Sequence, residues 1–374
     1  MTHLRQTPFY ERQRALGANF VDRIGFAAAG DYGSVRDEHM ATREAVGLFD
    51  VYYQVMIMVT GADARSFLDR VLVADMTRLK VGDVAYSTMC TAKGGIIDDL
   101  TVFCFGDDDI RLAPTPTRVP QTLAWLAAQK GDSAVAIVNL GYRDGYLSVQ
   151  GPNSRDLLSR LTDLDLSSAG LSYFAFTTGT VADVPGVTVS RTGYSGELGY
   201  ELFFPSEYAT HIWDRLLEQG ATLGARPCGL ASLVSLRTEK KYLLYGLDIT
   251  EQNNPIEAGL GWTLRKNKAE FVGRDKLVEL KSAGTPRQLV LLAGADLTAD
   301  FAIGDRIELG AGAGIVTSAS KGFFVGKSLA MGYVPTEAAV EGAVAKVVGK
   351  DGTIREATVH LKALHDPEGL RARA

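Results

Sequence analysis

The order in which strand-like and helix-like segments follow one another most constrains how this chain can fold. Between residues 55 and 244, runs with strand patterning are mixed with runs of helical periodicity, without a regular strand–helix–strand alternation. A doubly wound parallel sheet requires that alternation, so the order predicts a mixed α+β fold. The expected helices are 62–76, 117–129, 154–161, 206–223 and 230–244, and the expected strands are 55–60, 84–90, 100–105, 110–113, 146–150, 187–190 and 200–204.

The predicted secondary structure changes near residue 280. Beyond it, short strand-like runs are separated by Gly, Asp and Lys turns and helical periodicity is nearly absent, which is typical of a small β-barrel. Ser, Gly, Thr and Pro cluster around 281–285, so we expect a first region at 1–280 and a C-terminal β-barrel domain at 281–374. The expected barrel strands are 288–292, 306–309, 314–318, 329–334, 344–348 and 354–360.

Composition and charge exclude several classes of protein. Of the 374 residues, 46% are hydrophobic and 22% are charged, which excludes a disordered or fibrous chain. The net charge of −5 gives no reason to expect nucleic acid or an anionic membrane surface as a partner, and no apolar run approaches the roughly 18 residues of a membrane helix. The first twenty residues lack the apolar stretch of a secretory signal. Three widely spaced cysteines suggest a reducing cytoplasm rather than a disulfide framework.

The sequence also lacks the motifs of several common metal-binding and enzyme classes. Neither CxxC nor HExxH occurs, and apart from His360 and His365, which we assign to a strand end and a tail, no histidines share metal-ligand spacing, so we predict no metal site. There is no GxSxG elbow and no Walker loop. The alternating glycines at 310–314 lie between two strand-like runs, which indicates a hairpin rather than a dinucleotide site. The chemistry should therefore depend on carboxylates, tyrosines, an arginine or a bound cofactor.

The first stretch that suggests chemistry is 93–103, with the sequence KGGIIDDLTVF. Neighbouring residues of a strand point to opposite faces, so Asp98 and Asp99 cannot have the same role. Asp99 would share one face with Thr101 and Phe103. The structural alternative is a solvated aspartate at the start of a strand that follows a glycine turn.

The second stretch is 190–201, with the sequence SRTGYSGELGYE. Its three glycines, spaced three residues apart, would allow the backbone to approach a flat ligand or to adopt positive φ. Glu201, in the following strand, could accept two N–H hydrogen bonds from the guanidine-like edge of a heterocycle. A glycine-rich hairpin without a ligand is the alternative.

The third stretch is 235–262, in which a helix passes into a polar loop. Arg237 lies on this helix. A single helical arginine of this kind is more often a solvated surface charge than a functional residue, and the stretch alone does not decide between the two.

Together and in this order, the three stretches resemble the aminomethyltransferase family: the T-protein of glycine cleavage and its tetrahydrofolate-dependent relatives. Two further segments are similar to that family. Residues 47–51 (GLFDV) resemble an early family segment, and 314–318 with 330–334 resemble its C-terminal barrel. The resemblance extends from about Thr7 to His360. It implies a three-lobed, folate-binding body with a C-terminal small β-barrel and with the pterin in a central channel.

The resemblance also implies roles for individual residues. Asp99 matches the active-site acid at the pterin, and Glu201 matches the carboxylate that binds the pterin's amino edge. Arg237 matches a position that faces the negatively charged benzoyl-glutamate end of folate, where a guanidinium is well suited. The other positions expected to bind the folate are Tyr86, Thr101, Phe103, Thr115 and Tyr194.

Other positions depart from the family pattern. The T-protein has Ser-His-Met where this chain has Tyr52-Tyr53-Gln54. It also places an Asn against the folate where this chain has Thr115, which can donate one hydrogen bond but cannot replace a carboxamide. The family's YGNDI is YGLDI here, at 245–249. The residues expected to hold the folate thus match the family pattern, whereas those expected to face the donor differ from it.

This combination resembles the demethylase branch, in which tetrahydrofolate accepts a methyl group from a small methylated molecule. We therefore expect a cytoplasmic monomer or small homo-oligomer that transfers a methyl group, with a methoxy-aromatic acid as the favoured donor, to N5 of tetrahydrofolate. Tyr52 and Tyr53 could stack on an aromatic donor, although strand packing explains them equally well. Gln54 matches the corresponding residue of the dimethylsulfoniopropionate demethylase, so a methylated sulfonium compound is an alternative donor.

In the expected mechanism, Asp99 orients the pterin and helps to remove the N5 proton. One of Tyr53, Tyr242 and Tyr245 supplies a hydrogen bond to the leaving phenolate. Two alternatives remain. An aminomethyltransferase would act on a lipoyl carrier and release ammonia. A folate binder without enzymatic activity, of the kind that serves iron–sulfur assembly, would carry a distinctive cysteine loop, and Cys228 does not lie in that context.

Overall fold

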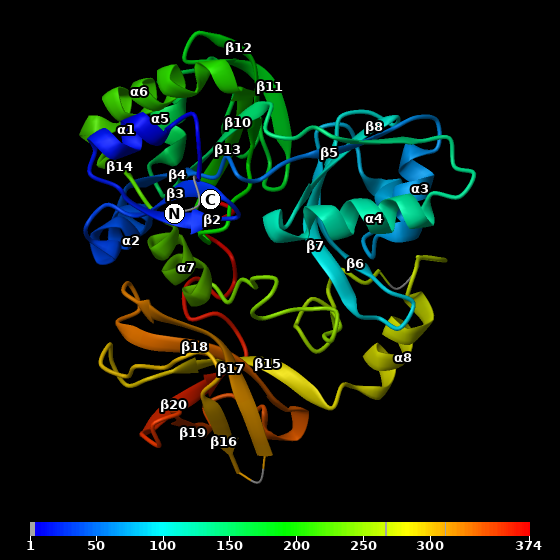
Figure 1. The fold of residues 1–374 in the computed structure, drawn as a ribbon, viewed down its shortest axis with the longest axis vertical. Coiled ribbons are helices and arrows are strands. Elements are labelled where there is room, and N and C mark those ends of the chain that lie inside the picture. The colour runs from blue at the N-terminus through cyan, green and yellow to red at the C-terminus, as the bar shows by residue number, and fades with distance from the viewer. Residues whose placement is uncertain (1–3, 266–267, 311) are drawn as a thin grey trace.

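Three lobes, each built on its own sheet, meet around the middle of the molecule (Figure 1). The computed structural model describes residues 4–265, 268–310 and 312–374. The first two lobes combine helices and strands, and the third is a closed barrel, so the predicted α+β fold with a C-terminal barrel is confirmed. Among the described residues, no helix is both long enough and apolar enough to cross a membrane.

The first lobe contains a six-stranded sheet whose inner face packs against amphipathic helices. In α6, residues Ile212, Trp213 and Leu216 recur at helical spacing and are fully buried against the sheet. In sheet order the strands are β11 (Phe176–Val181), β12 (Val184–Ser190), β13 (Gly199–Pro205), β10 (Asp144–Gln150), β4 (Val46–Asp50) and β14 (Ala225–Pro227). The helices of this lobe are α1 (Tyr10–Ala15), α2 (Val35–Glu44), α5 (Ser154–Ser159), α6 (Ala209–Gly220) and α7 (Leu230–Glu239).

A small sheet of three strands precedes this lobe. Its order is β1 (Arg5–Gln6), β3 (Phe26–Asp31) and β2 (Asn19–Arg23). The sequence analysis did not predict these strands or the helix α2. The residues after β1 contact the end of β4. There, Asp50 accepts hydrogen bonds from Thr7 (2.7 Å) and Gln13 (3.0 Å).

The second lobe contains a five-stranded antiparallel sheet covered by α3 (Ala64–Val71) and α4 (Val119–Gln129). In sheet order its strands are β6 (Val84–Cys90), β7 (Ile96–Cys104), β8 (Asp109–Pro114), β5 (Ile57–Thr60) and β9 (Ala136–Asn139). Its core is formed by every second residue of the strands, such as Leu100 and Val102, together with Phe67 and Leu68 of α3. The short 3₁₀ helices of the chain are η1 (Met76–Arg78), η2 (Pro116–Arg118), η3 (Ser206–Tyr208), η4 (Ala221–Leu223) and η5 (Thr336–Ala338).

The third lobe is a closed six-stranded barrel. Its strands, in order around the barrel, are β15 (Arg287–Ala293), β18 (Lys327–Pro335), β17 (Gly312–Gly322), β16 (Arg306–Leu309), β19 (Val344–Val348) and β20 (Ile354–His360). Strands β16 and β17 pair antiparallel with Leu309 opposite Gly312, which confirms the hairpin predicted from the glycine run. The barrel strands begin at Arg287, and the boundary predicted at 280/281 lies within α8 (Arg274–Ala283), a helix that the sequence analysis missed.

The helix predicted at 230–244 ends earlier, at Glu239. Lys241 adopts φ of 56°, a left-handed conformation that a continuing helix does not allow. The backbone turns there, with Tyr242 N–H donating to the Arg237 carbonyl at 2.8 Å. The residues that follow therefore form an irregular segment between the lobes, and this segment supplies Tyr245 and Asp248 to the middle of the molecule.

A buried ion pair connects this segment to the barrel. The Arg237 guanidinium donates to the Asp248 carboxylate at 2.6 Å and to Ser318 Oγ of β17 at 2.8 Å. Asp248 also accepts from Thr317 Oγ1 and Ser318 Oγ, both at 2.6 Å. The side chains of Arg237 and Asp248 are 1% and 0% exposed, so the charges neutralise each other away from solvent.

Candidate active site

Strand β7 places two adjacent carboxylates on opposite faces of the second lobe's sheet. Asp99 faces the same side as Tyr86 of β6, whose hydroxyl donates to it at 2.8 Å. Asp98 faces the other side, where Thr122 Oγ1 of α4 donates to it at 2.7 Å. The predicted alternation is confirmed, and only Asp99 points toward the middle of the molecule.

Asp99 is a partly buried carboxylate that accepts hydrogen bonds from two side chains. Besides the Tyr86 hydroxyl, Thr115 Oγ1 donates to Asp99 Oδ1 at 3.2 Å. Burial raises the pKa of Asp99 above its usual value, and the hydrogen bonds from Tyr86 and Thr115 offset part of that rise. Thr115 thus orients the acid, although it offers a single donor where the family has a carboxamide. A carboxyl group with a raised pKa accepts a proton more readily than an ordinary carboxylate does.

Asp98 is an acid that is largely protonated at neutral pH. Its side chain is fully buried, and burial followed by the charge of Asp99 raises its pKa to about 8. The Thr115 backbone N–H donates to Asp98 Oδ1 at 3.3 Å, so one threonine contacts both acids. The alternative of a solvated turn residue does not hold for either aspartate.

Glu201 lies on β13, opposite Ser148 of β10 and Ser190 of β12. Thr192 Oγ1 donates a short hydrogen bond to its Oε2. Burial raises the pKa of Glu201, whereas Thr192 and the neighbouring Tyr146 hydroxyl favour the charged form. Among the described residues, Glu201 has no ion-pair partner. A partly buried carboxylate without a counter-charge is well placed to accept hydrogen bonds from the N–H donors of a ligand.

The glycine-rich segment that precedes Glu201 is packed around a side chain that the sequence analysis missed. A Cβ on Gly193 would come within 2.1 Å of Gln150, and one on Gly199 within 2.3 Å. Gln150 accepts from Ser195 Oγ at 2.6 Å and donates to the Thr192 carbonyl at 3.2 Å. The glycine spacing therefore serves this packing, rather than the approach of the backbone to a ligand, and Gln150 fixes the loop.

Tyr194, at the tip of this loop, connects the two acid sites. Its hydroxyl donates a short hydrogen bond to the Leu243 carbonyl, and its ring stacks on Tyr242 with centroids 5.9 Å apart. Burial raises the pKa of Tyr194, and the charges of Asp99 and Arg23 both act on it. Tyr194 therefore lies close enough to Asp99 for the two groups to interact electrostatically, and its predicted place beside the folate stays a prediction.

An exposed tryptophan adjoins the Asp99 side of the site. Trp262 is 60% exposed and stacks on Tyr86, with ring centroids 5.7 Å apart and an interplanar angle of 22°. Such a ring offers a face on which a planar ligand could stack. Trp262 ends the third stretch of the sequence analysis but was not singled out, because nothing local connects it with Tyr86.

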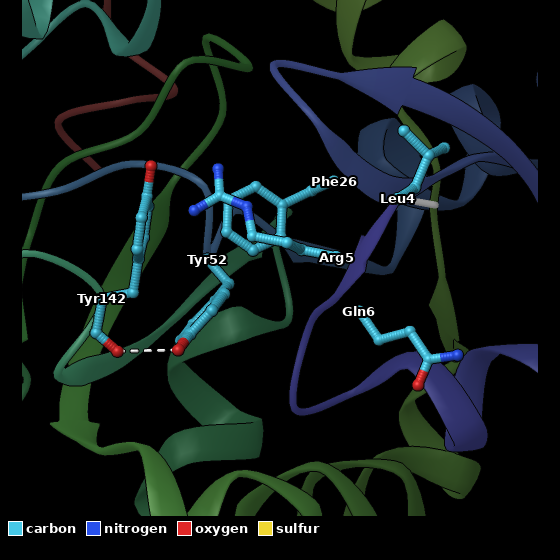
Figure 2. Close-up of a pocket in the computed structure, with 6 residues that line it drawn as sticks. All are labelled: Leu4, Arg5, Gln6, Phe26, Tyr52 and Tyr142. Atoms are coloured by element: carbon cyan, nitrogen blue, oxygen red, sulfur yellow. Dashed lines mark hydrogen bonds between the residues drawn. The ribbon is translucent and has the colours of Figure 1, made fainter. Parts of the chain in front are cut away.

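Tyr52 and Tyr53 lie in the turn that follows β4, and their predicted stacking on a donor stays a prediction. The Tyr52 hydroxyl donates to the Tyr142 carbonyl at 2.7 Å, and its ring lines an open pocket of about 700 Å³ beside Arg5 and Phe26 (Figure 2). Tyr53 is 5% exposed and belongs to a buried cluster rich in aromatic residues, against which Tyr52 also packs. Gln54 lies in the turn between them and β5, and its backbone N–H donates to the Val51 carbonyl at 2.9 Å.

Three further predicted residues are held by contacts within the protein. Phe103 is 1% exposed and packs edge-on against Phe203 with ring centroids 5.6 Å apart, and its place in a folate channel stays a prediction. Tyr245 donates to the Ile96 carbonyl at 3.0 Å, and burial raises its pKa to about 12. The Arg237 guanidinium is enclosed and paired with Asp248, so it does not present a free positive charge to the folate's anionic end.

Thr101 is partly buried on the Asp99 face of β7, opposite Tyr86. The structure thus gathers Tyr86, Asp99, Thr101, Thr115 and Tyr194 on one side of the middle and Glu201 on another. Their roles toward a ligand remain predictions.

The fold and this pair of acid sites define a three-lobed α+β protein with a C-terminal barrel, and comparisons with known proteins agree. A family model described as the GCVT N-terminal domain matches residues 9–268, and one described as the glycine cleavage T-protein C-terminal barrel domain matches 276–366. The chain therefore belongs to the aminomethyltransferase, or glycine-cleavage T-protein, family. This family uses tetrahydrofolate as a co-substrate in one-carbon transfer.

Individual relatives are similar over nearly their whole length. The chain is 37% identical to the aminomethyltransferase of Halothermothrix orenii, covering 96% of this chain and 99% of the relative, and 38% identical to that of Desulforamulus reducens, covering 89% and 91%. The crystal structure of the glycine cleavage system aminomethyltransferase T from Bartonella henselae superposes with a TM-score of 0.87 at 28% identity, covering 97% and 99%. These relatives are named aminomethyltransferases rather than demethylases.

Proposed function

We propose that this protein transfers a one-carbon unit to tetrahydrofolate and that an aminomethyl group is its first candidate source. The observation that carries the proposal is a pair of partly buried acids: Glu201, which has no cationic partner among the described residues, and Asp99, whose pKa is raised beside Tyr86 and Thr115. Glu201 would bind the pterin's amino edge through two charge-assisted hydrogen bonds. Asp99 would then exchange a proton with the reacting nitrogen. The names of the relatives support the aminomethyl group as the source.

Substitution of Glu201 by Gln tests the binding half of the proposal. We expect the Kd for tetrahydrofolate to rise about 30- to 100-fold, because a neutral amide offers one acceptor where the carboxylate offers two charged ones. Isothermal titration calorimetry measures this change. A tetrahydropteridine that lacks the 2-amino group should bind wild type and Glu201→Gln with similar affinity.

The matched control is Glu207→Gln, an exposed glutamate just beyond the end of the same strand. This variant should bind tetrahydrofolate like the wild type. Unchanged affinity in Glu201→Gln would contradict the assignment of the pterin's amino edge to Glu201.

Methyl transfer from a small methylated donor to N5 is a second candidate, favoured by one observation. Of the three tyrosines that could assist a leaving group, Tyr245 donates to Ile96 and Tyr242 interacts with Tyr173. The Tyr53 hydroxyl makes no hydrogen bond within the described part of the chain, although the residue is buried. It is therefore available as a donor to a departing oxygen.

For this candidate, Tyr53→Phe is expected to lower kcat about tenfold with a phenolate-releasing donor, because one neutral hydrogen bond to the leaving group is lost. With a donor that departs as a neutral thioether the change should be smaller. Tyr52→Phe serves as the control, since its hydroxyl is held by Tyr142. Equal effects of the two substitutions would rule out the role of Tyr53.

Product analysis separates the two candidates. Incubation with tetrahydrofolate and an aminomethyl-loaded lipoyl carrier should give ammonia and 5,10-methylenetetrahydrofolate if the first is correct. Incubation with methoxybenzoates or methylated sulfonium acids should give 5-methyltetrahydrofolate and the demethylated donor if the second is correct. Mass spectrometry identifies the folate product in both reactions.

A further inference from the structure

The C-terminal segment, residues 361–374, leaves the barrel after β20 and returns to the first lobe (Figure 1). All of its residues are described and none lies in a helix or a strand, so other contacts hold it in place. Asp366 pairs with Lys240, the residue that follows α7, at 2.8 Å, and both side chains are buried. The backbone N–H of the buried His365 donates to the Glu239 carbonyl at 3.2 Å. The segment is therefore packed into the protein rather than lying on its surface.

The C-terminal segment contacts the loop between β12 and β13, residues 191–198, which carries the tyrosine that interacts with the Asp99 site. Arg371 Nε donates to Glu197 Oε2 of this loop at 2.7 Å, and Arg371 Nη2 donates to the Arg43 carbonyl at 2.8 Å. One arginine thus connects the 191–198 loop to helix α2.

Glu197 is a buried carboxylate whose charge depends on these contacts. Arg43 Nη1 donates to its Oε1 at 3.0 Å, and His365 Nε2 lies 2.7 Å from the same oxygen. Burial alone would raise the pKa of Glu197, but His365, Arg43 and Arg371 together bring it below its usual value. The Arg371 side chain is 39% exposed, whereas that of Arg43 is fully buried. Arg371 can therefore be replaced while the buried Arg43–Glu197 ion pair is kept.

A second contact holds the start of the same loop. The buried Arg191 donates a short hydrogen bond from its Nη2 to the main-chain oxygen of Ala374. Arg191 is followed by Thr192, whose hydroxyl donates to Glu201. The C-terminal segment thus contacts the loop at two points, directly before Thr192 and at Glu197.

We propose that Arg371 is a positioning residue for tetrahydrofolate and that it acts through Glu197. The ion pair keeps the 191–198 loop in the arrangement that places Tyr194 and, on the strand that follows, Glu201. This inference rests on the proposed function, because it takes Glu201 as the group that binds the pterin. A loop released from the C-terminal segment would adopt this arrangement for only part of the time, and the apparent affinity for the pterin would fall by that fraction.

The test measures binding and loop protection rather than turnover. Arg371→Met is titrated in a calorimeter with tetrahydrofolate and with tetrahydropterin, which lacks the benzoyl-glutamate part. We expect the Kd for both to rise about 5- to 20-fold, because both carry the pterin. In the unliganded variant, hydrogen–deuterium exchange should become faster in the 191–198 loop and stay unchanged in β7. Saturating tetrahydrofolate should restore much of the protection of the loop.

Two variants serve as controls. Arg371→Lys keeps a cation beside Glu197 but loses the fork that also reaches the Arg43 carbonyl, so it should recover part of the affinity. Lys362→Met removes a cation of the same segment that pairs with Glu368 in solvent, and it should bind both ligands like the wild type. Thermal unfolding checks that each variant is folded. If Arg371→Met is not, the same measurements on Arg371→Gln decide.

Each result bears on the inference. Wild-type affinity in Arg371→Met would show that the arginine only anchors the C-terminal segment, so the inference would be wrong while the proposed function stands. Weaker binding of tetrahydrofolate but not of tetrahydropterin would mean that Arg371 contacts the ligand's tail directly, which also contradicts positioning. The same holds if both ligands bind more weakly while exchange in the loop is unchanged. If the wild type binds neither ligand, the proposed function itself fails, and the inference with it.

Discussion

Substitution of Asp99 by Asn is expected to lower kcat about 10²- to 10⁴-fold and to leave the Kd for tetrahydrofolate within a few-fold of wild type. The amide keeps the shape and the contacts with Tyr86 and Thr115, but it cannot accept or return a proton. Steady-state kinetics with the donor identified by product analysis gives kcat, and calorimetry gives the affinity. A loss confined to affinity would make Asp99 a binding residue only.

Asp98→Asn is the matched control on the neighbouring position. Because burial raises the pKa of Asp98 to about 8, the wild-type side chain is already largely neutral at pH 7, and an amide replaces it with little change. We expect kcat within about threefold of wild type. Substitution of these two adjacent aspartates would then lower kcat by amounts that differ by orders of magnitude. Equal losses in both variants would show that the assay reports damage to the strand rather than loss of the acid.

The same pair predicts a dependence of stability on pH. The folded-state pKa of Asp98 is raised from 3.8 to about 8, so the folded protein binds this proton more tightly than the unfolded chain does. Its favourable contribution is complete below about pH 4 and is lost as the pH rises toward 8. Urea unfolding from pH 5 to 9 should therefore show wild type losing stability relative to Asp98→Asn as the pH rises.

Asp248→Asn is expected to reduce the free energy of unfolding by about 3–5 kcal/mol, because it leaves the buried Arg237 guanidinium without its counter-charge. Asp248 accepts hydrogen bonds from Arg237, Thr317 and Ser318, so the substitution also weakens the contact between the body and the barrel. Chemical denaturation at pH 7 measures the change, which should exceed that of most single substitutions.

The control for this prediction is Asp214→Asn. Asp214 pairs with Arg12 at 2.7 Å, but both side chains are about half exposed, so the expected cost is below about 1 kcal/mol. Similar costs for the two substitutions would mean that the Arg237–Asp248 pair contributes no more than a surface ion pair. That result would also reopen Arg237 as a residue able to turn toward a ligand.

Part of the site could be predicted from sequence periodicity. The alternation of a strand separates Asp98 from Asp99, and the structure confirms that only Asp99 meets Tyr86. The same alternation does not apply to Tyr52 and Tyr53, because they lie in the turn between β4 and β5 rather than on a strand.

Other features depend on contacts between segments far apart in the chain. The glycine spacing at 193–199 is explained by Gln150, more than forty residues earlier. Trp262 meets Tyr86 across more than 170 positions of sequence. Neither pairing leaves a local pattern, so no analysis of a single sequence could have found them.

The sequence alone determined the mixed α+β class, the change to a barrel near residue 280 and which residues of β7 share a face of the strand, whereas it missed the N-terminal strands and the helices α2 and α8. These properties follow from local periodicity and turn chemistry. The tertiary structure decided which charges are neutralised and which acid has a raised pKa, as for Arg237 and Asp98. Burial and counter-charges come from distant segments, so ionisation and pairing are set only when the chain has folded.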